Sequence, residues 1–193
     1  YTSGTTGRSK GAMLTHGNLM SNATTMTQVM SFDEKDRLLS VLPLSHLYEQ
    51  VLGFLGPLVV GASIVYPVSR QPAVLIRTFR DFKVSVLLIV PQGLRLLDAA
   101  IERRVDQSGK RASFIGAHRW AQRAPRWPRR LLFRPDLREF GGRLHTIGVG
   151  ASALDLDVAE RWTEMGVDVL QGYGATEMGP VISFTRPEHN VLG

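Results

Sequence analysis

The sequence predicts an α/β fold in which a partial parallel sheet is flanked by helices. Segments with strand patterns alternate with segments with helix patterns along most of the chain, and such alternation is typical of βαβ units. The run VSVLLIVP at 84–91 is apolar on both faces, which indicates a strand covered on both sides. The 193 residues are 44% hydrophobic and 21% charged, an ordinary globular composition.

Each element follows from a local pattern. Thr15 precedes apolar residues at helical spacing and is the predicted N-cap of the first helix. Pro67 stops a β-branched run, and Gly166 closes the last helix. The expected strands cover 36–43, 62–67, 84–91, 143–150 and 167–174, with a further candidate at 180–185. The expected helices cover 14–30, 46–60, 71–83, 92–105 and 153–166.

The positive charge is concentrated in one segment. Residues 103–143 hold 12 basic and three acidic residues, which leaves 11 basic and 14 acidic residues elsewhere. Within this segment the stretch at about 108–142 interrupts the alternation of strands and helices, so we expect an irregular insertion or flexible loop there. Three interpretations stay open: a solvated linker whose arginine stems cover apolar surface, contact with an anionic membrane, or phosphate contacts to nucleic acid. No nucleic-acid recognition motif accompanies the charge, so we expect no specific nucleic-acid partner.

Composition also bears on the compartment. The chain has no cysteine, which fits a reducing environment and excludes a thiolate metal site or a thiol nucleophile. No apolar run reaches the roughly 18 residues of a membrane span. We therefore expect a cytoplasmic protein that is at most peripheral at a membrane.

The opening stretch YTSGTTGRSKG has the composition of a phosphate-binding loop. Its glycines let backbone amides approach anionic oxygens, and its hydroxyls and Lys10 add donors. A Gly/Ser/Thr turn at the surface is the alternative interpretation. The spacing excludes a Walker A loop, because Gly11 follows Lys10 where that motif has a serine or threonine.

A second motif, QGYGATEMGP at 171–180, follows a predicted strand. At the carboxyl end of a parallel strand it would face the same crevice as the opening loop. Tyr173 offers a flat face for a purine, Thr176 a hydroxyl for a phosphate, and Glu177 a hard oxygen ligand for Mg²⁺. Each residue taken singly has a structural alternative, as a packed tyrosine or a solvated glutamate.

Four motifs together resemble those of the adenylate-forming superfamily of acyl-CoA synthetases, luciferases and peptide-synthetase adenylation domains. They are YTSGTTGRSKGAMLTHGNL at 1–19, LPLSHLYEQ at 42–50, GVGASALD at 148–155 and GYGATE at 172–177. They occur in the family's order and spacing, and the similarity covers nearly the whole chain. The similarity is closest to the long-chain fatty acyl-CoA synthetases. The resemblance implies that the chain is a fragment of the large domain. It implies that the parent enzyme activates a fatty acid with ATP to an acyl-adenylate and then converts this to acyl-CoA.

The resemblance implies roles for individual residues. Lys10, Thr176 and Glu177 would act in catalysis, with Thr176 at the α-phosphate and Glu177 on Mg²⁺. His46 would lie at the carboxylate end of the acyl site together with Gly150 and Ala151, although a histidine before a helix is more often a cap or a core residue. The implied ATP-binding residues are Thr2, Ser3, Gly4, Thr5, Thr6, Gly7, Lys10, Gly150, Ala151, Ser152, Gly172, Tyr173, Gly174 and Thr176.

Two positions depart from the family pattern. Ser9 stands where proline usually precedes the lysine, and Ala151 stands where glycine is usual, so its methyl group would crowd the nucleotide.

The family's ribose-binding aspartate, hinge and C-terminal lid domain with its catalytic lysine would follow residue 193. We therefore expect residues 1–193 to be a partial AMP-binding domain, inactive alone, in a parent that uses ATP, Mg²⁺ and coenzyme A. The alternatives are a fatty acyl-AMP or aryl-acid ligase of the same superfamily, or a non-catalytic module that binds nucleotide or lipid.

Overall fold

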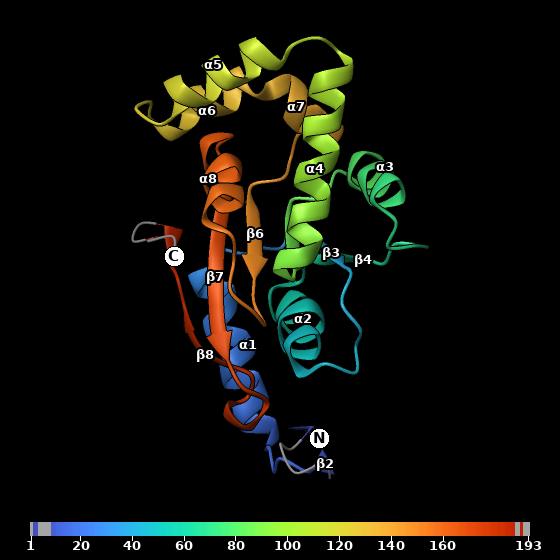
Figure 1. The fold of residues 1–193 in the computed structure, drawn as a ribbon. Helices are drawn as coiled ribbons and strands as arrows, with labels where there is room; N and C mark the ends of the chain where they lie inside the picture. The colour runs from blue at the N-terminus through green and yellow to red at the C-terminus, as the bar shows by residue number, and fades with distance from the viewer. Residues whose placement is uncertain (1, 4–8, 188–189, 191–193) are drawn as a thin grey trace.

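A computed structural model describes residues 2–3, 9–187 and 190 (Figure 1). Its main sheet has six strands in the order β4-β3-β5-β6-β7-β8. Neighbouring strands from β4 to β7 are parallel, and β8 is antiparallel to β7. The strands are β3 (Arg37–Ser40), β4 (Ser63–Val65), β5 (Val86–Ile89), β6 (Thr146–Val149), β7 (Asp168–Gly174) and β8 (Val181–Phe184). The predicted fold class is confirmed, and the candidate strand at 180–185 exists as the antiparallel β8.

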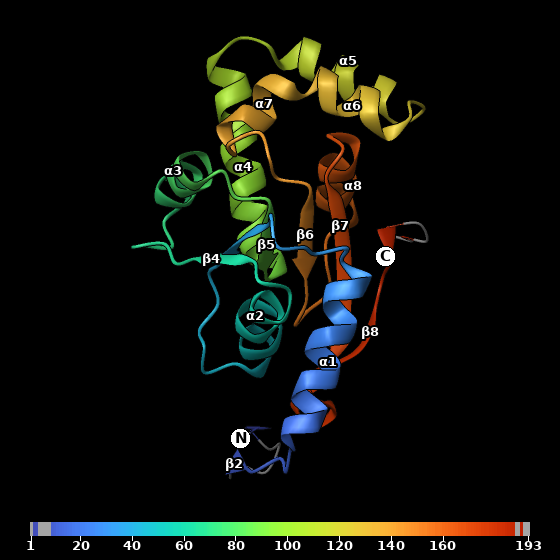
Figure 2. The ribbon, with the colours of Figure 1, turned by 180° about the vertical axis from the view of Figure 1, so that it is seen from behind.

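Helices cover both faces of this sheet. Figure 2 shows α1 and α2 on one face, and Figure 1 shows α4 and α8 on the other. The helices before residue 108 are α1 (His16–Val29), η1 (Glu49–Leu55), α2 (Gly56–Val60), α3 (Pro72–Phe82) and α4 (Pro91–Gln107). The later helices are α5 (Arg111–Ala121), α6 (Arg126–Leu132), α7 (Arg134–Glu139), α8 (Leu156–Glu164) and the 3-10 turn η2 (Thr176–Met178).

Strand alternation divides the core in two. Leu38 points toward α1 and η1, whereas Leu39 points toward α3 and α4, because successive side chains of a strand face opposite sides. The larger cluster contains Trp162, which has no exposed surface. Both faces of β5 are therefore buried, as its uniform hydrophobicity predicts.

The first helix begins where its sequence predicts. The Asn18 amide donates to Thr15 Oγ1 at 3.1 Å, and the Thr15 amide donates to Asn18 Oδ1 at 3.0 Å. This reciprocal pair is a capping box, which satisfies amides that the first turn leaves unpaired.

The predicted helix at 46–60 is irregular in its first half. Residues Glu49–Leu55 form a π-helix before α2 continues. The Glu49 carboxyl lies against Gly53, where a β-carbon would come within 2.4 Å of Glu49 Oε1. A side chain at residue 53 would therefore displace the inward-turned glutamate. π-Turns of this kind occur frequently at functional sites.

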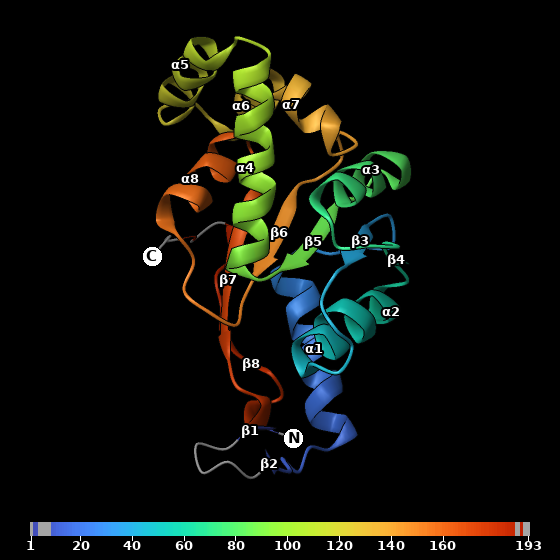
Figure 3. The same ribbon diagram turned by 45° about the vertical axis from the view of Figure 1, so that its right-hand side comes forward.

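The expectation of an irregular or flexible stretch at 108–142 is wrong. The stretch forms α5, α6 and α7, which lie at the amino ends of the strands (Figures 1 and 3). Phe133, Leu137 and Phe140 are buried in the larger core cluster at helical spacing. The arginine-rich composition hid this apolar stripe, since charged residues occupy most of the intervening positions.

The opening segment is described only at its two ends. β1 (Thr2–Ser3) pairs antiparallel with β2 (Ser9–Lys10), with Thr2 opposite Lys10. The predicted site residues Gly4, Thr5, Thr6 and Gly7 lie outside the described residues. Among the described residues, no helix combines the length and the hydrophobicity needed to cross a bilayer.

Candidate functional site

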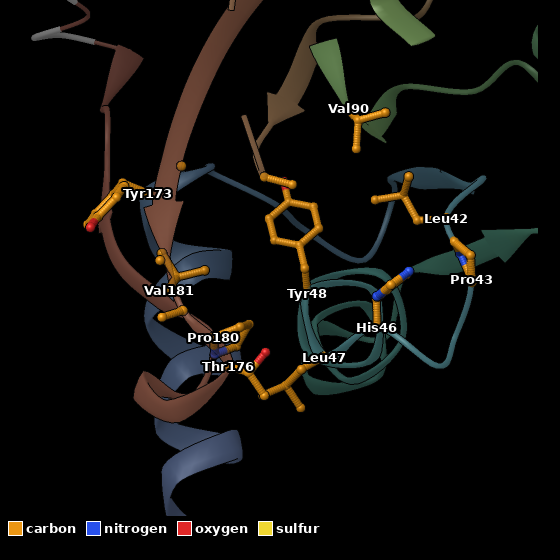
Figure 4. A pocket seen from close by; sticks show the side chains of 14 residues that line it. Leu42, Pro43, His46, Leu47, Tyr48, Val90, Tyr173, Thr176, Pro180 and Val181 are labelled. Carbon is orange, nitrogen blue, oxygen red and sulfur yellow. The ribbon is translucent and has the colours of Figure 1, made fainter. Parts of the chain in front are cut away.

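One cavity of about 430 Å³ joins three of the four motifs (Figure 4). Its walls come from the segments that follow β3, β5 and β6 and from the end of β7 through to β8. This placement is the carboxyl edge of the parallel strands, where ligands bind in open α/β sheets. The cavity-lining residues are Leu42, Pro43, His46, Leu47, Tyr48, Val90, Ala151, Gly172, Tyr173, Gly174, Ala175, Thr176, Pro180 and Val181.

The structure brings most of the predicted residues of the later motifs together. The predicted residues that line the cavity are His46, Ala151, Gly172, Tyr173, Gly174 and Thr176. Gly150 lies just behind the wall, since a β-carbon there would stand 3.1 Å from the Tyr48 ring. Ser152, on the turn after β6, does not line the cavity.

The remaining predicted residues lie apart from the cavity. Glu177 is exposed on η2, one residue beyond Thr176. Thr2 and Lys10 lie on β1 and β2, at the same end of the molecule as η2 (Figure 3). No cluster of three metal-ligating side chains occurs in the part of the chain that the structure describes. Glu177 would thus act as a single protein ligand, which suits Mg²⁺ because that ion commonly takes one or two carboxylates plus substrate phosphates.

The end of β7 owes its shape to glycines. A β-carbon on Gly172 would come within 2.7 Å of the Phe184 ring. One on Gly174 would come within 1.9 Å of the Pro180 carbonyl oxygen, where the pairing of β7 with β8 shifts register. The Asn22 side chain donates to the Val181 carbonyl at 2.9 Å and ties α1 to this hairpin. The glycines therefore let the backbone beside Tyr173 and Thr176 approach β8 closely.

Two tyrosine side chains, Tyr48 and Tyr173, line the cavity. Tyr173 is 71% exposed at the rim, so its ring face is available to a planar ligand. Tyr48 stands in the middle (Figure 4), between the wall that holds Leu42 and Val90 and the wall that holds Thr176. Burial raises the pKa of Tyr48, and its hydroxyl has no hydrogen-bond partner among the described residues.

Sequence reasoning assigned no role to Tyr48 or to its neighbour Glu49. Glu49 has no exposed surface, and Ser40 donates a hydrogen bond to its carboxylate. Desolvation raises the pKa of Glu49 to about 7, opposed by the Ser40 hydrogen bond and by the charge of Arg70. Their position in the sequence could have indicated a role at the site, since both residues fall within LPLSHLYEQ, two and three residues after His46.

Ala151 occupies a backbone conformation that favours glycine. Its φ is +74°, in the left-handed region where a β-carbon costs about 1–2 kcal/mol. This strain agrees with the glycine expected at the position from the family pattern. The methyl group also lines the cavity.

We expect Ala151→Gly to stabilise the protein by about 1 kcal/mol, because relief of the left-handed strain outweighs the added freedom of the unfolded chain. Urea unfolding measures this change. Ala175 is the matched control, since it lines the same cavity with an extended backbone at φ −146°. Ala175→Gly should instead destabilise the protein, and a loss of stability in Ala151→Gly would contradict the strain.

Glycine-rich turns and a hydroxyl around one cavity, at the carboxyl edge of a parallel sheet, define an α/β domain with a ligand site at its strand ends. The chain belongs to the AMP-binding enzyme family, which matches residues 1–193.

Individual relatives are similar along the whole chain. It is 34% identical to the peroxisomal long chain acyl-CoA synthetase 7 of Arabidopsis thaliana, covering 100% of this chain and 29% of that protein. It is 33% identical to the mitochondrial malonate–CoA ligase of Xenopus laevis, covering 98% and 29%. The crystal structure of ATP-bound MatB from Rhodopseudomonas palustris superposes with a TM-score of 0.70 at 25% identity, covering 100% and 31%. The chain thus spans under a third of the length of these relatives.

Proposed function

We propose that the chain is the central part of the large domain of an acid–thiol ligase. This ligase would activate a carboxylic acid with ATP to an acyl-adenylate and transfer the acyl group to coenzyme A. The observation that carries the proposal is the single cavity that joins the histidine motif with the ends of β6 and β7. The relatives are CoA ligases by name, and the chain matches them over nearly all of its length.

The acid would occupy the apolar part of the cavity beside Leu42, Leu47 and Val90, with its carboxylate near His46. No general base is required, because a carboxylate is already ionised at neutral pH. Catalysis would consist of positioning the carboxylate toward the α-phosphate and stabilising charge on the departing pyrophosphate. The apolar walls favour a fatty acid, which refines the proposal to a long-chain fatty acid–CoA ligase.

The nucleotide would occupy the opposite part of the cavity. Tyr173 offers its exposed ring to adenine, and the Thr176 hydroxyl faces the cavity (Figure 4) and would contact the α-phosphate. Gly172 and Gly174 leave room for close approach along the backbone, while Gly150, Ala151 and Ser152 would border both substrates. Bound at Glu177, Mg²⁺ would neutralise phosphate charge. The segment from Thr2 to Lys10 would hold the β- and γ-phosphates.

ATP–pyrophosphate exchange by the full-length protein tests the proposal, with a panel of long-chain, malonic and aryl acids. We expect the highest kcat/KM with a long-chain acid. Thr176→Val should lower exchange about 100-fold through loss of a transition-state contact, whereas Thr25→Val, on the exposed face of α1, should not. Exchange with aryl acids alone would support an aryl-acid ligase. Exchange without thioester formation would support an acyl-AMP ligase, and no exchange with any acid would support a non-catalytic module.

The extent of the chain and the location of its parent are part of the same proposal. Purified residues 1–193 should form no acyl-CoA, because the lid domain with its catalytic lysine would lie beyond them. We also propose a cytoplasmic parent, which the composition of this part of the protein fits. Fractionation with compartment markers and thioester assays of the purified chain check these two statements.

A further inference from the structure

Two of the three helices of the basic segment, α6 and α7, line a second cavity at the end of the sheet opposite the candidate site. Figure 3 shows α5, α6 and α7 beyond the amino ends of β5 and β6, away from η2 and β2. A cavity of about 500 Å³ lies between α6, α7 and the end of α3. Its lining contains five cationic side chains and no carboxylate: Lys83, Arg130, Arg134, Arg138 and Arg143.

Most of these cations have no acidic partner in the described part of the chain. Lys83, Arg134, Arg138 and Arg143 are exposed, and no described carboxylate lies within 4.0 Å of them. Neighbouring arginines differ, since Arg104 pairs with Glu139 at 2.8 Å and Arg126 pairs with Asp168 at 2.7 Å. Glu139 and Asp168 are thus paired with arginines outside the cavity lining, and four of the five cavity cations have no carboxylate partner among the described residues.

The deepest of the five cations is held in place by the fold. The half-buried Arg130 guanidinium donates to the Leu144 and Gly166 carbonyls at 2.9 and 3.0 Å. Its stem passes over Gly166, where a β-carbon would come within 2.5 Å of Arg130 Cγ. The guanidinium is therefore pre-organised at the cavity wall, and this lowers the entropic cost of binding an anion.

Apolar side chains rim the same cavity. Trp127 and Leu131 lie one turn apart on α6, both line the cavity, and they are 69% and 55% exposed. Tryptophan and arginine side by side are favoured at the interface between headgroups and acyl chains. A free phosphate ion or a DNA backbone would leave Leu131 uncovered, whereas a lipid surface would accept it together with the arginines.

We propose that the face formed by α6, α7 and the end of α3 docks on a membrane of anionic phospholipid. Lipid phosphates would enter the arginine cavity, and Trp127 and Leu131 would enter the headgroup region. The candidate site lies at the far end of the sheet, so docking here would leave its cavity facing away from the bilayer. The inference is independent of the proposed reaction, because no residue of the candidate site takes part.

Sedimentation of the full-length protein with sucrose-loaded vesicles tests the inference. We expect binding to phosphatidylcholine vesicles that contain phosphatidylserine, little binding to phosphatidylcholine alone, and release by salt. The triple variant R134Q/R138Q/R143Q should lose roughly 100-fold in partition coefficient, since each basic residue near an anionic surface contributes about fivefold. Trp127→Ala should weaken binding further in that background.

The control variant R77Q/R95Q/R186Q removes the same charge from exposed positions outside the cavity. It should bind vesicles within a few-fold of wild type, and circular dichroism should show that both triple variants are folded. Failure of the wild type to bind anionic vesicles at low salt would overturn the inference, as would equal losses in the two triple variants. Two further results would overturn the inference. One is displacement from the vesicles by millimolar inorganic phosphate, which indicates a free-anion site. The other is tighter binding to a DNA duplex than to anionic vesicles.

Discussion

Gly174→Ala is expected to abolish nucleotide binding and to destabilise the protein by several kcal/mol. The added β-carbon would stand 1.9 Å from the Pro180 carbonyl oxygen and 2.9 Å from the Pro180 carbonyl carbon. Because both atoms belong to the backbone, the clash is relieved only if β7 and β8 separate at their register shift. Separation would displace Tyr173 and Thr176 from the cavity wall, and misplacement by about 1 Å costs roughly 100-fold in catalysis.

Calorimetric titration with ATP and thermal unfolding measure the two effects of Gly174→Ala. The matched control is Gly116→Ala on α5, where a β-carbon meets no atom within 4 Å. This control should be neutral or slightly stabilising, since alanine is the better helix former. Nucleotide affinity in Gly174→Ala equal to that of the wild type would show that the close approach of β7 to β8 is not needed.

Glu49→Gln is expected to remove a pH dependence of stability that spans two to three pH units. Burial raises the pKa of Glu49 from 4.5 to about 7, so the folded protein retains a proton that the unfolded chain releases. The glutamate therefore contributes most stability below pH 4.5, and this contribution is lost as the pH rises through 7. At 1.36 kcal/mol per unit, the full loss is about 3 kcal/mol.

Urea unfolding of wild type and Glu49→Gln from pH 4.5 to 8 checks this prediction. The two proteins should differ least at the acidic end, and the variant should gain relative stability toward pH 8. Glu160→Gln on the exposed face of α8 is the control, and it should track the wild type. If the stability of wild type and Glu49→Gln depends on pH in parallel, Glu49 is ionised throughout this pH range despite its burial and its hydrogen bond from Ser40.

The burial of Glu49 could not be predicted from the sequence. LPLSHLYEQ drew attention to His46, which the structure places on the cavity wall. Its neighbours Tyr48 and Glu49 lie at the start of a π-turn, and the Glu49 carboxyl packs against Gly53 within that turn. Neither periodicity nor residue type indicates such a turn, since it depends on how the helix packs on β3 and β5.

For the basic segment at 108–142, the predicted irregular structure was wrong. Its charge was evident from the sequence, but its helices were not, because the stripe formed by Phe133, Leu137 and Phe140 lies among arginines. Folding gathers side chains from the end of α3 and from α6 and α7 into one cavity. Separations of up to 60 residues, from Lys83 to Arg143, place that convergence beyond any local pattern.

The sequence by itself determined the α/β class, the identity and order of most elements, and the motifs that carry the family resemblance. These follow from hydrophobic periodicity, capping and glycine placement, which are local properties. Only the tertiary structure decided that three motifs share one cavity, that Tyr48 stands across it, and that Ala151 is strained. It also separated the basic cavity from the candidate site by the length of the sheet. These arrangements depend on strand order and on close packing between distant segments, and neither is encoded within any single window of residues.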